Sequence, residues 1–331
     1  MVRGRGGEPF AAPHRTVRWL AVAENVSDYG RFDFRALWSG RERVTEVEQA
    51  ILTRLLSDAD RRRILEVGTG FGRLLAPLRA LGREVVATDF DAESLATLPL
   101  GSSDENVTRV AANLYHLPFV DGAFTAASMV RVYHHLSDPA AALSELARVL
   151  RPGARLIVSY NPKPSLGTVV NDIQRAIHPS PRASFKSLTF SRGPLELAPD
   201  PFPVYVAGRS HFRQEATATG FRLEKEVVSG LEEYYFMRHV PAELFVQLGC
   251  ALGRAPVFPM RFAALENRSG RPGSLPVREE ILACPKCRTP MPTWSRGGRL
   301  TCDRCSYAGS IRAGVADLRY LPPHTERWEA A

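Results

Sequence analysis

The sequence predicts a doubly wound α/β fold of seven strands with helices on both faces of the sheet, followed by a small C-terminal β module. Three observations predict it. Strand-like apolar runs alternate with amphipathic helical stretches, a glycine-rich turn follows the first of these runs, and two C-x2-C pairs lie near the C-terminus. Strands and helices in alternation are typical of a parallel sheet covered on both faces.

The predicted elements follow one another in chain order. We expect strands at 64–67, 84–88, 109–111, 123–129, 155–160, 221–228 and 262–265, and helices at 41–56, 74–80, 92–98, 139–150, 168–177, 212–219 and 242–252. In the first helix, apolar residues such as Val47 and Ile51 recur at helical spacing. We expect Cys250, in the last helix, to be a small buried apolar group.

Composition divides the chain into four parts. Residues 1–40 are expected to be a flexible N-terminus with an aromatic leader or lid, whose Tyr29, Phe32, Phe34 and Trp38 could close over a ligand pocket. Residues 41–266 form the main domain, in which the Pro-, Ser- and Arg-rich stretch 161–210 is expected to be a substrate-lid insertion. Residues 267–277 are a hydrophilic linker, and residues 278–325 are the cysteine module.

The formal net charge of +8 allows an anionic partner such as RNA. The basic residues are spread along the chain, and we expect the densest run, Arg61–Arg63, to lie at a solvated strand start. No window approaches eighteen uninterrupted apolar residues, and residues 1–18 lack the apolar core of a signal peptide. These features predict a cytoplasmic protein that does not associate with membranes.

The glycine-rich turn occupies the run Ile64 to Leu74, which reads ILEVGTGFGRL. A turn of this kind at a strand end brings the backbone close to an anionic ligand. A dinucleotide site would have Gly or Ala three residues after the second glycine, and Arg73 stands there, so NAD and FAD are disfavoured. Asp89 ends the second strand, where a carboxylate can accept hydrogen bonds from ribose hydroxyls.

An ordered series of motifs follows this turn. It comprises NLYHLPF at 113–119, GAFTAA at 122–127, HHL at 134–136 and LRPGARLIV at 150–158. With Gly-x-Gly-x-Gly after an acidic residue, the series resembles the class I S-adenosylmethionine-dependent methyltransferases, and within them the type 11 small-molecule family that includes the ubiquinone and menaquinone biosynthesis enzymes. The resemblance covers residues 40–160 well, residues 210–266 loosely, and implies a Rossmann-like seven-stranded methyltransferase fold.

The resemblance implies S-adenosyl-L-methionine as cofactor and a set of residues that bind it. These are Glu66, Gly68, Thr69, Gly70, Gly72, Asp89, Phe90, Asn113, Leu114 and Met129. Two positions depart from the family pattern, which usually has Asp where this chain has Asn113 and Thr125. An amide oxygen can still accept the hydrogen bond of the adenine amino group, so we expect Asn113 to retain its role.

Methyl transfer is an in-line displacement that depends chiefly on orientation, and a general base is needed where the acceptor must lose a proton. Tyr133 and His134 follow the fourth strand at the sheet edge where ligands bind, so each is a candidate base or acceptor-positioning residue. The alternative is that the pair His134–His135 caps and packs the next helix. The sequence shows neither the Pro-Pro-aromatic motif of amino-group methylation after strand four nor a nucleophilic Cys there.

The cysteine module contains Cys284, Cys287, Cys302 and Cys305, with fourteen residues between the two pairs. This spacing predicts a four-cysteine zinc ribbon in which the intervening residues form a hairpin. Four protein ligands leave no place for a reacting water, so the Zn²⁺ is expected to be structural; a redox pair is the alternative. The run Gly314 to Leu318 resembles the last strand of small zinc ribbons that partner methyltransferases, some of which act on RNA.

Three functions are consistent with these residues. The leading hypothesis is methylation of an O, N or C atom of a small metabolite. The second is an RNA methyltransferase that uses the cysteine module to dock rRNA or tRNA, and the third is a non-catalytic regulatory protein that binds the cofactor. The sequence does not identify the acceptor or the oligomeric state.

Overall fold

The computed structural model describes residues 34–322 apart from 102–104, 164–168, 170–172, 174–194, 197–204, 231, 233–238, 254, 256–257, 271–272 and 292–297. The helices are α1 (Phe34–Trp38), α2 (Glu42–Leu56), α3 (Leu75–Leu81), α4 (Ala92–Ala96), α5 (Pro139–Val149), α7 (Arg209–Ala218) and α8 (Ala242–Ala251). Between residues 63 and 267, the strands of the main sheet are β1 (Arg63–Val67), β2 (Glu84–Asp89), β3 (Val107–Ala111), β4 (Phe124–Met129), β5 (Leu150–Tyr160), β9 (Phe221–Ser229) and β10 (Met260–Asn267). A separate small sheet contains β6 (Pro162–Lys163), β8 (Tyr205–Gly208) and β7 (Leu195–Glu196).

These seven strands lie in the order β3-β2-β1-β4-β5-β10-β9 within one sheet. The first five are parallel, as the alternation of strands and helices predicts. Strand β10 runs antiparallel between β5 and β9, with Phe262 opposite Ser159 and Val227. The predicted parallel sheet is present from β3 to β5, and β10 and β9 add two antiparallel pairings to it.

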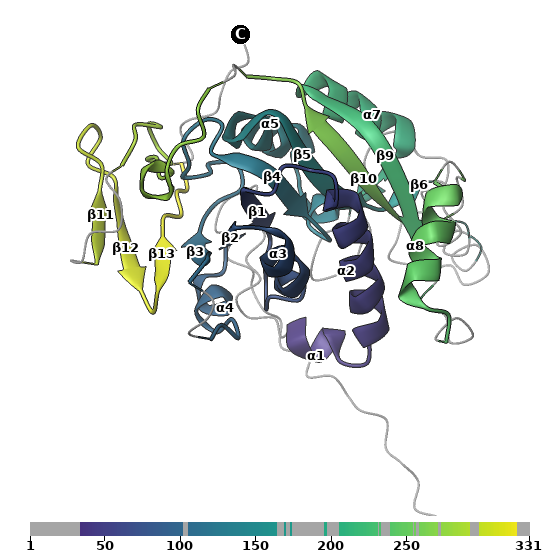
Figure 1. Cartoon of the computed structure of the whole chain (residues 1–331). Coiled ribbons are helices and arrows are strands. Elements are labelled where there is room, and N and C mark those ends of the chain that lie inside the picture. Colours follow the sequence, from purple (N-terminus) through teal and green to yellow (C-terminus); the bar gives the residue numbers. More distant parts are fainter. Residues whose placement is uncertain are drawn as a thin grey trace, which may run out of the picture.

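Helices cover both faces of the sheet (Figure 1). Helices α2, α3 and α8 pack on one face, where their apolar residues meet Ile64, Ala126 and Phe262. Helices α5 and α7 pack on the other face, over Leu65 and Ala127. Every residue of β1 and β4 is buried, and their apolar side chains each meet one of these two cores. This burial explains why the sequence shows continuous apolar runs there.

The cysteine module continues the same sheet. Its strands β11 (Arg299–Thr301), β12 (Ala308–Arg312) and β13 (Val315–Asp317) extend it to ten strands, because β13 pairs with β3 in parallel. The register places Ala316 opposite Val110. The module also bonds to the main domain before its first cysteine, where Val120 N donates to Ile281 O at 2.9 Å. Figure 1 shows the three strands at the β3 edge.

Two expectations about single residues are wrong. Cys250 is exposed, because α8 buries the face that carries Phe245, Val246 and Gly249, and Cys250 lies beside it. In the run Arg61–Arg63, Arg62 is exposed as expected, whereas Arg63 is 2% exposed: it pairs with Glu84 at 2.5 Å and donates to the carbonyl oxygens of two other segments.

Some expectations fall outside the described residues. These include the N-terminal stretch 1–33 and most of the insertion 161–210 with its helix at 168–177. Within the part of the chain that the structure describes, no helix combines the length and apolarity needed to cross a bilayer.

Glu145 ties α5 to both parts of the molecule, and it generates the first prediction. This side chain is 5% exposed and accepts hydrogen bonds from Leu117 N at 3.0 Å, Arg148 at 2.6 Å and Arg288 of the cysteine module at 3.2 Å. Glu145→Ala should lower the free energy of unfolding by about 3 kcal/mol, because it leaves buried partners unpaired. Arg288→Ala, the control, removes a 61% exposed partner and should cost under about 1 kcal/mol. Equal urea-unfolding losses in the two variants would contradict this assignment.

Candidate cofactor site and cysteine cluster

A cavity of about 210 Å³ opens at the carboxyl ends of β1, β2 and β4. Ligands bind at this edge in open α/β sheets. Of the predicted cofactor residues, seven line the cavity: Gly68, Thr69, Gly70, Asp89, Phe90, Asn113 and Leu114. Glu66, Gly72 and Met129 do not line it; Glu66 and Met129 are buried at the ends of their strands. Seven of the ten predicted residues thus lie together at one cavity, whose lining includes further residues.

The glycine turn after β1 is shaped by close backbone approach. Gly68, Gly70 and Gly72 all have positive φ, of 71°, 52° and 85°. A Cβ on Gly68 would lie 2.2 Å from a methyl group of Val132, so no larger residue fits there. The turn's N–H groups are bonded within the protein: Gly68 and Thr69 donate to Thr88 O, and Gly70 donates to Asp89 at 2.7 Å. These three backbone N–H groups therefore already have acceptors within the protein, and the turn would contact a ligand through close packing.

Two carboxyl groups lie beside this turn: Glu66 is buried, and Asp89 is partly buried and lines the cavity. Burial raises the pKa of Glu66 to about 8, against a weaker opposing effect of the hydrogen bond from Thr69. Burial also raises the pKa of Asp89, although Asp91 N and Gly70 N donate to it. At neutral pH the Glu66 carboxyl is therefore largely protonated. A cationic group of a ligand placed beside it would favour the ionised form.

A cluster of charged and aromatic side chains forms another part of the cavity wall. Glu48 on α2 is fully buried and binds both Arg73 and Arg131, the latter at 2.8 Å. The Trp38 ring lies 3.9 Å from the Arg73 guanidinium and 5.1 Å from that of Arg131. Trp38, Arg73 and Arg131 all line the cavity.

Two guanidinium groups of this cluster, those of Arg73 and Arg131, pair with the carboxylate of Glu48 and line the cavity. Such a site is suited to bind a carboxylate. Arg131 has a left-handed φ of 62° just after β4, and its N–H donates to the buried Ser159 hydroxyl at 2.7 Å. The strained backbone aims its side chain toward α2.

The motif analysis missed the charged members of this cluster and anticipated Trp38 as part of a lid. Helical periodicity marks Glu48 as part of α2, and no local signal connects it with Arg73 or Arg131. An acidic residue on an otherwise apolar helix face was the one available hint.

Tyr133 and His134 point away from the cavity, whereas His135 and Leu136 line it. The Tyr133 ring packs edge-on against Phe212 at 5.2 Å, and its hydroxyl donates to Glu215. Burial and Glu215 raise the pKa of the Tyr133 phenol far above its usual range. Burial lowers the pKa of His134, which is 8% exposed. A phenol held protonated is a poor general base.

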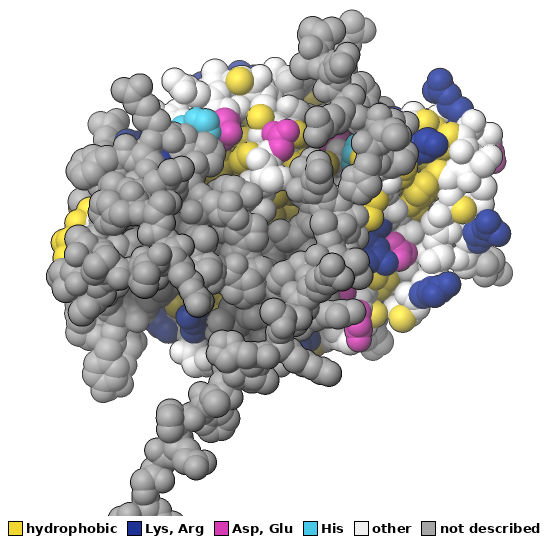
Figure 2. Space-filling model, turned by 180° about the vertical axis from the view of Figure 1, so that it is seen from behind, with side chains coloured by type: hydrophobic (Ala, Val, Ile, Leu, Met, Phe, Trp, Pro, Cys, Tyr) yellow, Lys and Arg dark blue, Asp and Glu magenta, His cyan; other side chains and the backbone are white. Residues whose placement is uncertain are grey.

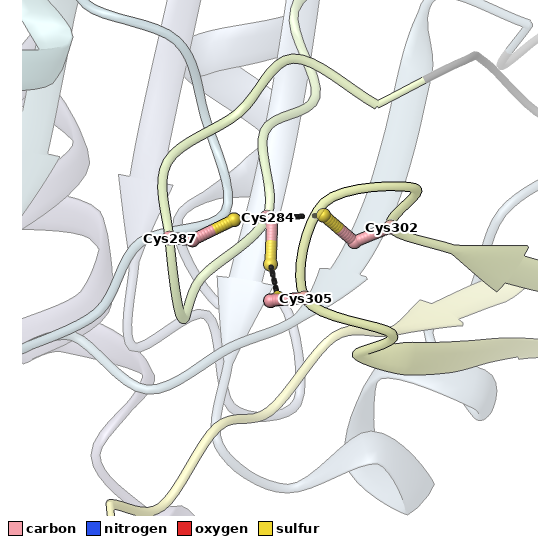
Figure 3. Close-up of side chains that lie close together, drawn as sticks. All are labelled: Cys284, Cys287, Cys302 and Cys305. Carbon is pink, nitrogen blue, oxygen red and sulfur yellow. Dashed lines mark hydrogen bonds between the residues drawn. The ribbon is translucent and has the colours of Figure 1, made fainter.

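The four module cysteines come together in space (Figure 3). Their sulfur atoms all lie within 4.8 Å of one another, with Cys284–Cys305 and Cys287–Cys302 each at 3.5 Å. Four sulfurs around a tetrahedral Zn²⁺ are about 3.8 Å apart, given Zn–S bonds of about 2.3 Å. The cluster therefore has the size and the donor set for one Zn²⁺.

The two cysteine turns have the same backbone structure. Each is followed by a residue of positive φ, Arg288 at 61° and Ser306 at 58°. Arg288 N donates to Cys284 O, and Ser306 N donates to Cys302 O, at 2.8 and 3.0 Å. This repeated turn holds each pair of thiols on one side of the chain.

The raised pKa of Glu66 predicts a pH-dependent stability. Between about pH 4.5 and 8 the folded chain retains a proton that the unfolded chain loses, so the free energy of unfolding falls as pH rises through this window. The full effect is on the order of 3–5 kcal/mol. Glu66→Gln should remove this slope, measured by urea unfolding at pH 5, 6.5 and 8. Glu46→Gln, on the exposed side of α2, should keep it; equal slopes in all three proteins would refute the assignment.

Comparison with known proteins identifies the domain that holds the cavity. Residues 65–158 match the family model described as a methyltransferase domain. A demethylmenaquinone methyltransferase of Thermus thermophilus is 40% identical over 110 residues, which are 32% of this chain and 50% of that protein. A demethylmenaquinone methyltransferase of Clavibacter sepedonicus is 33% identical over 135 residues, 39% of this chain and 54% of that protein. The chain thus spans about half the length of the curated relatives it matches.

A solved structure shows the same fold. The S-adenosylmethionine-dependent methyltransferase of Listeria monocytogenes, described as putative, superposes with a TM-score of 0.50 and 12% identity, over 70% of this chain and 100% of that one. Residues 65–158 are therefore similar to a methyltransferase domain, and the chain shares the fold of this solved methyltransferase structure.

Proposed function

We propose that this protein is an S-adenosylmethionine-dependent methyltransferase that transfers a methyl group to an O, N or C atom of a small molecule. The observation that carries the proposal is the cavity at the ends of β1 and β2, lined by the glycine turn and Asp89 within the matched domain.

The cavity residues fit the two ends of this cofactor. Asp89 would accept hydrogen bonds from the ribose hydroxyls, and Phe90, Asn113 and Leu114, the adenine wall, would enclose the base. At the other end, Glu66 is buried beneath the glycine turn, outside the cavity lining, and a cofactor ammonium group near the turn would favour its ionised form. The guanidinium groups of Arg73 and Arg131, which line the cavity, would donate hydrogen bonds to the cofactor's carboxylate.

The bound cofactor supplies an electrophilic methyl group on a sulfonium centre. The chain's own residues orient it and exclude water, through the close fit at Gly68 and the apolar side chains of Val130, Val132 and Leu136. We assign no proton transfer to Tyr133 or His134, because both are turned into the protein; we assign them the packing of the segment after β4. His135 is the member of this run that would contact a ligand.

We propose a structural Zn²⁺ at Cys284, Cys287, Cys302 and Cys305. Two of the four cysteines are buried, and the identical turns present all four sulfurs to one point. Four thiolates complete the tetrahedral shell, so this ion would stabilise the module and would take no part in methyl transfer.

For the methyl acceptor we propose a class of compound, a small molecule, and no particular compound. The relatives named for demethylmenaquinone match about a third of this chain, and the matched family model ends at residue 158, before β9 and β10. RNA is not proposed as acceptor: where Figure 2 colours the side chains of the back face, Lys and Arg are scattered among acidic and apolar groups.

The cofactor proposal predicts micromolar binding of S-adenosylmethionine and S-adenosylhomocysteine in calorimetric titration. Asp89→Ala should weaken binding ten- to a hundredfold, the effect of losing hydrogen bonds to a charged group. Asp60→Ala, at an exposed turn, is the control and should bind as wild type does. Absence of binding to the wild-type chain would end the proposal.

The metal proposal predicts one zinc per chain. Cys302→Ser should lose the metal and lower Tm by at least about 5 °C, because metal binding stabilises so small a module. Cys250→Ser changes an exposed cysteine outside the cluster and should leave metal content and Tm unchanged. Equal Tm values for these two variants would refute the structural role.

A further inference from the structure

The segment after β13 reaches the adenine wall from outside the cavity. Leu318 N donates to Ala111 O at 2.9 Å and continues the pairing with β3. The next residue, Arg319, donates to Phe90 O at 3.2 Å, and its guanidinium lies 5.4 Å from the centre of the Phe90 ring. Tyr320 O then accepts a hydrogen bond from the Asn113 side chain at 2.9 Å. Two residues of the wall are thus held by the cysteine module.

The oxygen and the NH2 group of the Asn113 side-chain amide both form hydrogen bonds within the protein. Its oxygen accepts from Tyr115 N at 3.0 Å, and its NH2 group donates to Tyr320 O. The side chain is 3% exposed, so these contacts are shielded from water. An aspartate could accept from Tyr115 N, but its second oxygen would face the Tyr320 carbonyl oxygen, and both would be acceptors. The contact with Tyr320 therefore requires an amide at position 113.

The 319–320 segment is itself fixed by the module. Asp317 binds the Arg319 guanidinium through both oxygens, at 2.8 and 2.6 Å. The Tyr307 hydroxyl donates to Arg319 O at 3.0 Å, and its ring lies edge-on to that of Tyr320. Tyr307 belongs to the second cysteine turn, since its carbonyl accepts from Cys302 N at 2.8 Å. An unbroken series of contacts leads from the cysteine cluster to the cavity wall.

We propose that the cysteine module is a positioning element of the cofactor site, in which Arg319 and the Tyr320 carbonyl hold Phe90 and Asn113 in place for the adenine. The proposal rests on the proposed function and adds to it that cofactor affinity depends on the metal-bound module. Arg319 and Tyr320 act through Phe90 and Asn113, so they are positioning residues.

Asn113→Asp gives a test in which two views predict opposite results. If residue 113 acts on the adenine alone, aspartate, the usual residue of similar methyltransferases, should bind S-adenosylhomocysteine at least as tightly as asparagine. If the Tyr320 contact matters, Asn113→Asp should weaken binding about tenfold in calorimetry. Arg319→Ala should weaken it about fivefold. Arg304→Ala, an exposed arginine of the same module, should leave it unchanged.

Zinc binding gives a second readout, because coupling between two sites is reciprocal. Saturating S-adenosylhomocysteine should raise the zinc affinity of the wild-type chain, measured at equilibrium against a chromogenic chelator. The increase should shrink in Asn113→Asp and Arg319→Ala and persist in Arg304→Ala.

The outcomes separate the two proposals. If the wild-type chain, Asn113→Asp and Arg319→Ala all bind S-adenosylhomocysteine equally well, the positioning role is overturned and the proposed function stands. Wild-type chain that binds neither S-adenosylmethionine nor S-adenosylhomocysteine would overturn both. Weaker binding in both variants, with one zinc per chain retained, would support the positioning role.

Discussion

The parallel pairing of β13 with β3 brings the cysteine module to the cavity. Without it, β3 would be the edge of the main-domain sheet, and exposed edges invite pairing with other chains. The register sets Asp317 opposite Ala111, so the next residues pass the ends of β2 and β3, where the cavity opens. A single strand pairing thus both covers an edge and supplies contacts to the adenine wall.

Pairing between buried charges determines how the side chains are arranged where Trp38, Arg73 and Arg131 line the cavity. Buried charges are costly unless paired, and Glu48 is fully buried between Arg73 and Arg131. Glu66 meets the same constraint by staying largely protonated at neutral pH. The protein therefore has a buried acidic group beneath the glycine turn and two guanidinium groups in the cavity lining.

The family model described as a methyltransferase domain matches residues 65–158 of this chain. The matched stretch ends within β5, whereas α7, β9, α8 and β10 follow it. In this later part the Phe212 ring stacks on that of Tyr160, with ring centres 4.0 Å apart. Phe212 also meets Tyr133, in the segment after β4, edge-on at 5.2 Å.

The sequence by itself determined the features that depend on neighbouring residues. Apolar runs and helical spacing located β1, β2, β4 and α2 to within about a residue or two, because burial on both faces leaves a continuous pattern. The glycine turn and Asp89 located the cavity, and the two C-x2-C pairs located the cysteine cluster, because each is a local motif.

Only the tertiary structure decided contacts between distant parts of the chain. Asn113 and Tyr320 are 207 residues apart, and Glu48 and Arg131 are 83 apart. No local sequence pattern marks either pair. The packing of the sheet brings the two residues of each pair together. The same reason explains the errors at Cys250 and Arg63: periodicity shows that an element has a buried side, but the neighbouring elements decide where that side ends.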